Sequence, residues 1–155
     1  MKKIKFLTLF LVGVSFFSLQ SCSKDDDAQV VQDARDQYVG TWNSITTGNL
    51  TLFQNGQSVG TVPLNESGPV TISKSGSNSL LIDGKIYIVN GNNLTSNPTP
   101  ITDNNTSGVV IIATENSNGT LGSNIILNST ITGTWNNTNG ASGNLSGNGV
   151  QTLTR

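Results

Sequence analysis

Between residues 38 and 155, apolar residues gather in short runs that turn-forming residues separate. The clearest run lies within 124–135, where Ile125, Leu127, Ile131 and Trp135 fall on alternate positions. A period of two places these side chains on one face of a strand, as in an antiparallel sheet with one buried face. The pattern predicts strands over 39–46, 49–53, 58–64, 69–73, 79–83, 85–89, 108–114, 124–131 and 149–153.

Asn-Gly and Asp-Gly pairs stand beside or between many of these runs. Such pairs supply the positive φ angles that tight type I′ hairpin turns demand. The clearest hairpin has Asp83-Gly84 between the apolar stretches 80–82 and 85–88. We expect turns at Asn55-Gly56, Asp83-Gly84, Asn90-Gly91, Asn118-Gly119 and Asn148-Gly149.

Nine short strands in sequential hairpins predict an all-β domain over residues 38–155. We expect an antiparallel up-and-down barrel of about eight strands, with a β-sandwich as the alternative. Helices are disfavoured there because the region holds two alanines and no methionine and is rich in Asn, Thr and Gly. Its apolar content and near-neutral charge also argue against disorder.

The segment 27–38 differs from the rest, because Val31, Ala34 and Tyr38 recur at helical spacing. Asp27 could cap the start of a short helix, and Gly40 would stop it. The alternative is a flexible stalk.

The first residues have the features of a secretory signal peptide. Lys2, Lys3 and Lys5 precede the apolar stretch 6–17. That stretch is too short to cross a bilayer core, which needs about 20 apolar residues. A basic start, a short apolar run and small residues behind it are typical of a cleaved signal peptide.

Leu19-Gln20-Ser21-Cys22 resembles the lipobox of bacterial lipoproteins. The resemblance implies cleavage before Cys22, a diacylglycerol on its sulfur and acylation of the new amino terminus. Cys22 is the only cysteine of the chain, so it has no partner for an intramolecular disulfide. We therefore expect a signal peptide at 1–21 and a lipidated tether at 22–37.

The residues after Cys22 resemble the export signal of surface lipoproteins in Bacteroidota, a lysine followed by acidic residues. The resemblance rests on Lys24, Asp25, Asp26 and Asp27. It implies an outer-membrane protein that is lipid-anchored and faces the cell exterior. The alternative interpretation is a solvated acidic tether.

Composition excludes several kinds of chemistry. The chain has no histidine and Cys22 is assigned to lipid, so His or thiolate metal sites and histidine-based catalytic triads are excluded. No basic patch is present to bind nucleic acid. We expect a non-catalytic monomer without a cofactor. A hydrolase that uses Asp83 or Glu66 is the alternative from another class.

One segment resembles an incomplete calcium-binding loop. Asp103, Asn105 and Ser107 precede Gly108 with the spacing of the first ligands of such a loop. The twelfth position is Thr114, and Glu115 comes one residue late. We therefore expect a turn at 103–108 rather than a metal site.

Gly40-Thr41-Trp42 resembles the Gly-x-Trp entry of lipocalin-like proteins. In that family the tryptophan closes one end of an eight-stranded barrel and a late arginine packs over it. The resemblance implies a structural plug made of Trp42 and Arg155. We expect a structural or binding role, toward a surface glycan or protein. The alternative is a lipocalin-like carrier of a small apolar ligand, although side chains can also fill such a barrel.

The lipid anchor can be tested by replacing Cys22 with Ala. Without the sulfur that carries the diacylglycerol, the protein should leave the membrane fraction or keep its signal peptide. Fractionation and mass measurement check this outcome. Normal processing and unchanged membrane attachment in the variant would contradict it.

Overall fold

The computed structural model describes residues 32–106 and 108–155, without the side chains of residues 105 and 106. The contacts divide the chain into Met1–Gln32 and Asp33–Arg155, and the second unit carries the fold. The predicted signal peptide at 1–21, Cys22 and the residues 24–27 predicted as an export signal lie outside the described residues. Within the described ranges, no helix is long and apolar enough to cross a membrane.

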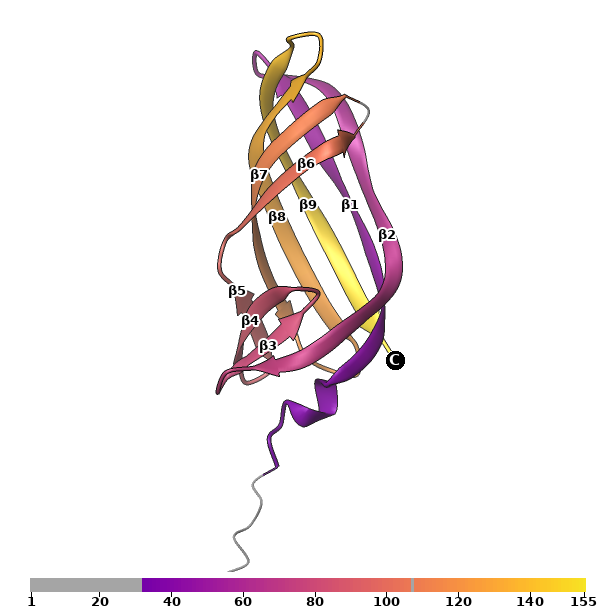
Figure 1. The fold of residues 1–155 in the computed structure, drawn as a ribbon, viewed down its shortest axis with the longest axis vertical. Coiled ribbons are helices and arrows are strands. Elements are labelled where there is room, and N and C mark those ends of the chain that lie inside the picture. The colour runs from indigo at the N-terminus through magenta and orange to yellow at the C-terminus, as the bar shows by residue number, and fades with distance from the viewer. Residues whose placement is uncertain (1–31, 107) are drawn as a thin grey trace, which may run out of the picture. The chain divides into compact units, whose positions relative to one another are not determined.

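The unit contains one short 3-10 helix and nine strands (Figure 1). Their bounds are η1 Asp36–Tyr38, β1 Gly40–Gln54, β2 Gln57–Ser75, β3 Ser79–Ile82, β4 Lys85–Asn90, β5 Asn93–Ser96, β6 Thr99–Thr106, β7 Val109–Thr120, β8 Ile125–Asn137 and β9 Ser142–Thr154.

The strands form a single antiparallel sheet in the order β5-β4-β3-β2-β1-β9-β8-β7-β6. An additional pairing between β5 and β7 closes eight of them into a ring. Strands that follow one another in the sequence are neighbours, and β9 returns to pair with β1. The expected antiparallel, all-β, up-and-down architecture is confirmed.

β5 and β6 act as one interrupted strand along a single edge of β7. Asn93 pairs with Thr120, and Thr99 pairs with Glu115. Residues 97–98, Asn-Pro, form the interruption. β5 also pairs with β4, whereas among the described residues β6 pairs only with β7.

The β3–β4 hairpin is much shorter than the strands beside it. β3 has 4 residues and β4 has 6, whereas β2 has 19 and β7 has 12. The hairpin therefore lines only the end of the ring near η1 (Figure 1). Beyond the hairpin turn, on the side away from η1, β2 and β6 show no pairing to each other among the described residues. We call this gap in the hydrogen-bonded ring the seam.

Prolines mark both strands of the seam. Pro63 and Pro69 lie in β2, and Pro100 lies in β6. Proline has no N–H, so it fits a strand only where its nitrogen faces away from the paired neighbour. Each proline therefore removes a donor from the unpaired side, a known protection against edge-to-edge association.

Several strand boundaries differ from the predicted ones. The runs 39–46 and 49–53 form the single strand β1, and 58–64 and 69–73 form β2. The runs at 108–114, 124–131 and 149–153 are parts of the longer strands β7, β8 and β9. The predictions missed β5 and β6, because these strands are built mostly from Asn, Thr, Ser and Pro.

Two of the five predicted turn pairs were wrong, because Asn118-Gly119 lies inside β7 and Asn148-Gly149 inside β9. A Cβ at Gly119 would collide with the carbonyl oxygen of Ile126 in the neighbouring strand. At Gly149 a Cβ would make only ordinary contacts, the nearest with Cδ1 of Leu64 at 3.6 Å, whereas a Cβ on its partner Gly48 in β1 would meet the Cα of Gly149 at 2.8 Å. Gly119 and Gly48 therefore serve close strand contact rather than turns.

The turns at Asn55-Gly56 and Asp83-Gly84 are confirmed. Both residues of each pair have positive φ, with values of 53° and 80° in the first pair and 50° and 77° in the second. The third predicted turn is shifted by one residue, because Gly91 and Asn92 connect β4 to β5. Gly91 has φ 59°.

The predicted helix over 27–38 is reduced to η1 in its described part. Arg35, just before η1, donates to the carbonyl oxygens of Gly76 and Ser79 at 3.1 and 2.9 Å. Its guanidinium also forms an ion pair with the Asp33 carboxylate at 2.6 Å, and its backbone N–H donates to the same carboxylate. These two interactions with Arg35 hold the pKa of Asp33 well below its usual range. Arg35 thus fastens the start of the domain to the β2–β3 turn.

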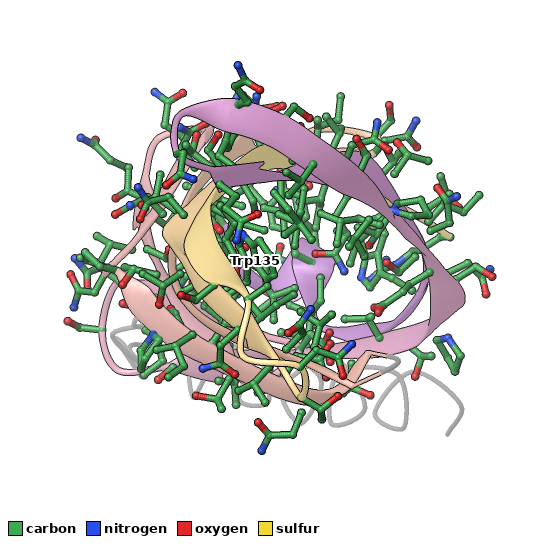
Figure 2. The ribbon with its side chains drawn as sticks, turned by 90° about the horizontal axis from the view of Figure 1, so that it is seen from above. Trp135 is labelled. Carbon is green, nitrogen blue, oxygen red and sulfur yellow. The ribbon has the colours of Figure 1, made fainter. Side chains whose placement is uncertain are left out.

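The interior contains two apolar clusters. Figure 2 shows side chains inside the ring of strands, with Trp135 labelled among them. The first lies at the closed end and comprises Tyr38, Trp42, Val70, Ile72, Leu80, Ile82, Tyr87, Leu94, Leu121, Ile125, Leu127 and Leu153. The second lies beside the seam and comprises Leu50, Leu52, Ile111, Ala113, Ile131, Trp135 and Leu145.

Trp42 is 3% exposed and belongs to the first cluster. Its indole N–H donates to the carbonyl oxygen of Tyr38 at 2.8 Å. The guanidinium carbon of Arg155 lies 4.6 Å from the ring centroid, within cation–π range. Arg155 also donates to the carbonyl oxygen of Val39 at 2.8 Å, so the end of the chain is fixed over the start of the sheet.

Trp42→Ala should destabilise the domain by about 3–5 kcal/mol, because it removes a buried aromatic side chain. Trp42→Phe should cost less. Trp135, 6% exposed, is the matched control because it also follows a Gly-Thr pair. We expect Trp135→Ala to cost less stability than Trp42→Ala. The cluster around Trp135 lies beside the seam, where β2 and β6 are not paired to each other and can shift toward a cavity. Denaturant unfolding checks the order, and a Trp42→Ala variant as stable as the wild type would contradict it.

Candidate functional site

A belt of polar residues separates the two apolar clusters. Along β1, β8 and β9 the inward positions change from apolar to polar near the middle of each strand and back again. Along β7 they change from apolar to polar at Glu115 and Ser117. The inward polar side chains are Ser44, Thr46, Glu115, Ser117, Ser129 and Gln151. Lys85, the first residue of β4, joins them from the short hairpin.

A pocket of about 270 Å³ lies at this belt, and we call it the waist pocket. The Asp83-Gly84 turn ends the β3–β4 hairpin beside it, so the pocket occupies the space that a longer hairpin would fill. Its lining residues are Thr46, Leu64, Glu66, Ile82, Asp83, Lys85, Tyr87, Glu115, Ser129, Ile131, Gly149 and Gln151. A second pocket of about 150 Å³ shares Thr46, Glu66, Asp83 and Gln151 with it.

The strongest interaction in the waist pocket is an ion pair between β4 and β7. The ammonium nitrogen of Lys85 lies 2.5 Å from Oε2 of Glu115. Their side chains are 15% and 18% exposed, so both charges are largely removed from water. Taking charges out of water is costly, and a buried pair persists only when further hydrogen bonds satisfy its atoms.

Two serines supply these hydrogen bonds. Ser117 donates to Oε1 of Glu115 at 2.7 Å, and Ser129 also donates to that oxygen. Lys85 donates to the Ser117 hydroxyl at 3.2 Å. Burial acts to raise the pKa of Glu115, but the bonds from Lys85, Ser129 and Ser117 outweigh it and hold the pKa below the ordinary 4.5.

Tyr87 lies next to this network and is 3% exposed. Burial, together with the negative charges of Glu115 and Asp83, raises its pKa to about 12, although a hydrogen bond with Ser117 acts in the opposite direction. The phenol is therefore neutral at physiological pH. It offers the pocket a hydroxyl group without a charge.

Glu66 and Asp83 stand at the rim of the pocket, and both are exposed. No ion pair to either carboxylate is found within residues 32–106 and 108–155. The two acids proposed for a hydrolase are thus brought to one pocket, although they are 17 positions apart in the sequence (83 − 66). The third acid that lines the pocket is Glu115, which is paired with Lys85.

Sequence reasoning missed Lys85, Glu115, Ser117 and Ser129 as a group. A signal was present, because Glu115 follows the apolar run 108–114 on an inward position where a hydrophobic residue would continue the core. An acid at such a position requires a cationic partner. The sequence could not identify that partner, since Lys85 lies 30 positions away (115 − 85).

The network places a serine hydroxyl beside the side chain of a lysine. Ser117 and Lys85 are close enough for a nucleophile and a base, but the Lys85 ammonium has no lone pair to accept a proton while it is paired with Glu115. Among the described residues, no three His, Cys, Asp or Glu side chains are grouped to hold a metal ion.

The segment that resembles a calcium loop is mostly a strand. Asp103 lies in β6 and pairs with Ile111, so it does not lie in the predicted turn. The turn is confined to the end of that segment, where Gly108 has φ 77°. The side chain of Asn105 and all of Ser107 lie outside the described residues.

Glu115→Gln tests the ion pair through the pH dependence of stability. Because the folded pKa of Glu115 is lowered, its contribution is present above pH 4.5 and is lost as the pH falls below that value. The wild type should therefore lose stability on acidification more steeply than the variant. Melting temperatures from pH 7 to pH 3 check this, with Glu66→Gln as the control that removes an exposed acid at the rim of the pocket. Equal slopes for wild type and Glu115→Gln would contradict the assignment.

Comparison of the chain with protein-family models, with curated proteins and with solved structures gave no match. The function therefore has to be inferred from the residues of the waist pocket and from the sequence features described above. These residues combine an internal ion pair with two rim carboxylates and an apolar wall.

Proposed function

We propose that this protein is a surface-anchored outer-membrane lipoprotein with a non-catalytic binding role, and that its waist pocket takes a small, positively charged organic molecule. The observation that carries the ligand proposal is the charge of the pocket. Lys85 and Glu115 offset each other, and Glu66 and Asp83 leave an excess of two negative charges. A cleft lined by one sign of charge concentrates ligands of the opposite sign.

The remaining lining favours an organic cation over a bare metal ion. Leu64, Ile82 and Ile131 form an apolar part of the wall, which can contact a short aliphatic chain. Thr46 and Gln151 add neutral hydrogen-bonding groups. Small-molecule sites commonly combine apolar walls with a few well-placed polar groups. A primary amine with a few methylene groups meets both requirements.

The distribution of polarity favours a polar ligand over an apolar one. Side chains of the two apolar clusters pack on either side of the belt, and the waist pocket lies where the polar residues are. An apolar carrier would place its empty volume among apolar residues. The chain's lack of histidine and the pairing of Lys85 with Glu115 support a role without catalysis.

The proposed location rests on the sequence. A basic and apolar leader, Cys22 in a lipobox-like setting and the acidic run after Lys24 support lipidation and display on the outer surface. A lipocalin-like origin of the barrel is supported by the contact of Arg155 with Trp42 at the closed end of an eight-stranded ring.

Binding can be measured by calorimetry and by amide NMR shifts, with 1,4-diaminobutane and n-butylamine as probes. Glutarate is the matched anionic probe. The wild-type domain should bind the amines and not glutarate, with shifts centred on Asp83, Lys85 and Gln151. The double variant Glu66→Gln/Asp83→Asn should weaken amine binding at least tenfold, because it removes the excess negative charge.

Asp36→Asn serves as the control, because Asp36 is an acid of η1 that does not line the pocket. It should leave amine affinity unchanged. The ligand proposal fails if neither amine binds the wild type, or if the double variant binds as tightly as the control.

A further inference from the structure

The outer surface of β1, β8 and β9 carries no charge. These three strands contain 15, 13 and 13 residues, and none of the 41 is Asp, Glu, Lys or Arg. Charged residues make up 11% of this chain, so a stretch of 41 residues would hold about four or five at that frequency (0.11 × 41). Exposed charge normally keeps a surface soluble. Its absence over three adjacent strands distinguishes this face from the waist pocket.

The same face is hollowed. A depression of about 380 Å³ is lined by Asn49, Thr51, Thr130, Ser146, Gly147 and Asn148, and we call it the outer groove. Gly147 lines the groove with its backbone. A Cβ on Gly147 would point to the inner side of the sheet and lie 2.8 Å from the Cα of Leu50 in β1. The missing side chain lets β9 lie close against β1.

The sheet register arranges the groove residues in rows across the strands. Asn49 pairs with Asn148, and Asn148 pairs with Thr130. The next row along the strands contains Thr51 and Ser146. Neighbouring strands lie about 4.8 Å apart, so amide and hydroxyl groups repeat at that interval across the groove. Every side chain that lines it can both donate and accept hydrogen bonds.

This lining excludes most classes of partner. Protein interfaces depend on aromatic and Arg anchors, and nucleic acids require Lys or Arg at their phosphates. None of these residue types lines the outer groove. A neutral ligand rich in hydroxyl groups matches it, because such a ligand exchanges hydrogen bonds with amides and hydroxyls without any charge to neutralise.

An apolar residue beside the groove fits the same ligand. Val150 follows Asn148 on the outward face of β9 and is 40% exposed. Sugar rings carry C–H groups as well as hydroxyl groups, so a ring could pack against Val150 while its hydroxyls reach Asn148. We propose that the outer groove binds a neutral polysaccharide, independently of the waist pocket.

Native gels cast with neutral polysaccharides test this proposal on the folded protein. The panel comprises dextran, mannan, galactan, xylan and a soluble β-1,3-glucan, with dextran sulfate as the charged comparison. At least one neutral polymer should retard the wild-type protein. In the retarding polymer, the side-chain amide NMR signals of Asn49 and Asn148 should shift.

Thr130→Lys and Ser146→Lys place a charge in the groove and should abolish the retardation. Thr71→Lys is the control, because it adds the same charge on an exposed position of β2 outside the groove, and it should retain binding. Melting curves check that all three variants are folded. The proposal is overturned if no neutral polymer retards the wild type, or if the groove variants bind as the control does. Glu66→Gln/Asp83→Asn should not change polysaccharide binding, which separates this site from the waist pocket.

Discussion

The structure depends on a mismatch of strand lengths within a closed ring. The β3–β4 hairpin is too short to accompany β2 and the β5–β6 edge along their full length. Below the hairpin turn the ring is closed by hydrogen bonds and filled by the cluster around Trp42. Beyond the hairpin turn, on the side away from η1, the sheet remains open at the seam. There, prolines remove N–H donors from the edges of β2 and β6 that are not paired to each other.

The polar belt lies where the closed and open parts meet. The waist pocket leaves the Lys85 and Glu115 side chains 15% and 18% exposed, so their charges are buried at a lower cost than in a fully closed core. Lys85 projects inward from the end of the hairpin and meets Glu115 from β7, and the two serines complete their hydrogen bonds. The ion pair joins the short β3–β4 hairpin to the long strand β7. The two other acids of the waist pocket, Glu66 and Asp83, lie at its rim. The outer groove depends on a separate feature, the close contact of β1 and β9 at Gly147.

The sequence was informative where a local signal determines local structure. Positive φ at Asn55-Gly56 and Asp83-Gly84 follows from residue type, and alternating apolar residues predicted the core face of β8. It was uninformative where distant strands set the outcome. Gly119 resembles a turn residue, yet it lies in a strand because a neighbouring carbonyl occupies the space of its Cβ. β5 and β6 have few apolar residues, and pairing holds them, β5 to both β4 and β7 and β6 to β7. The partner of Glu115 depends on the register of the whole sheet.

Hydrogen exchange of the β2 amides tests the open seam most directly. The prolines at 63 and 69 imply that odd-numbered residues of this part of β2 direct their N–H groups into the seam, while even-numbered residues donate to β1. The amides of Thr61, Asn65 and Ser67 should therefore exchange quickly, and those of Val62, Leu64 and Glu66 slowly. Uniform protection along 61–67 would show that another strand or segment closes the seam, and it would contradict the account.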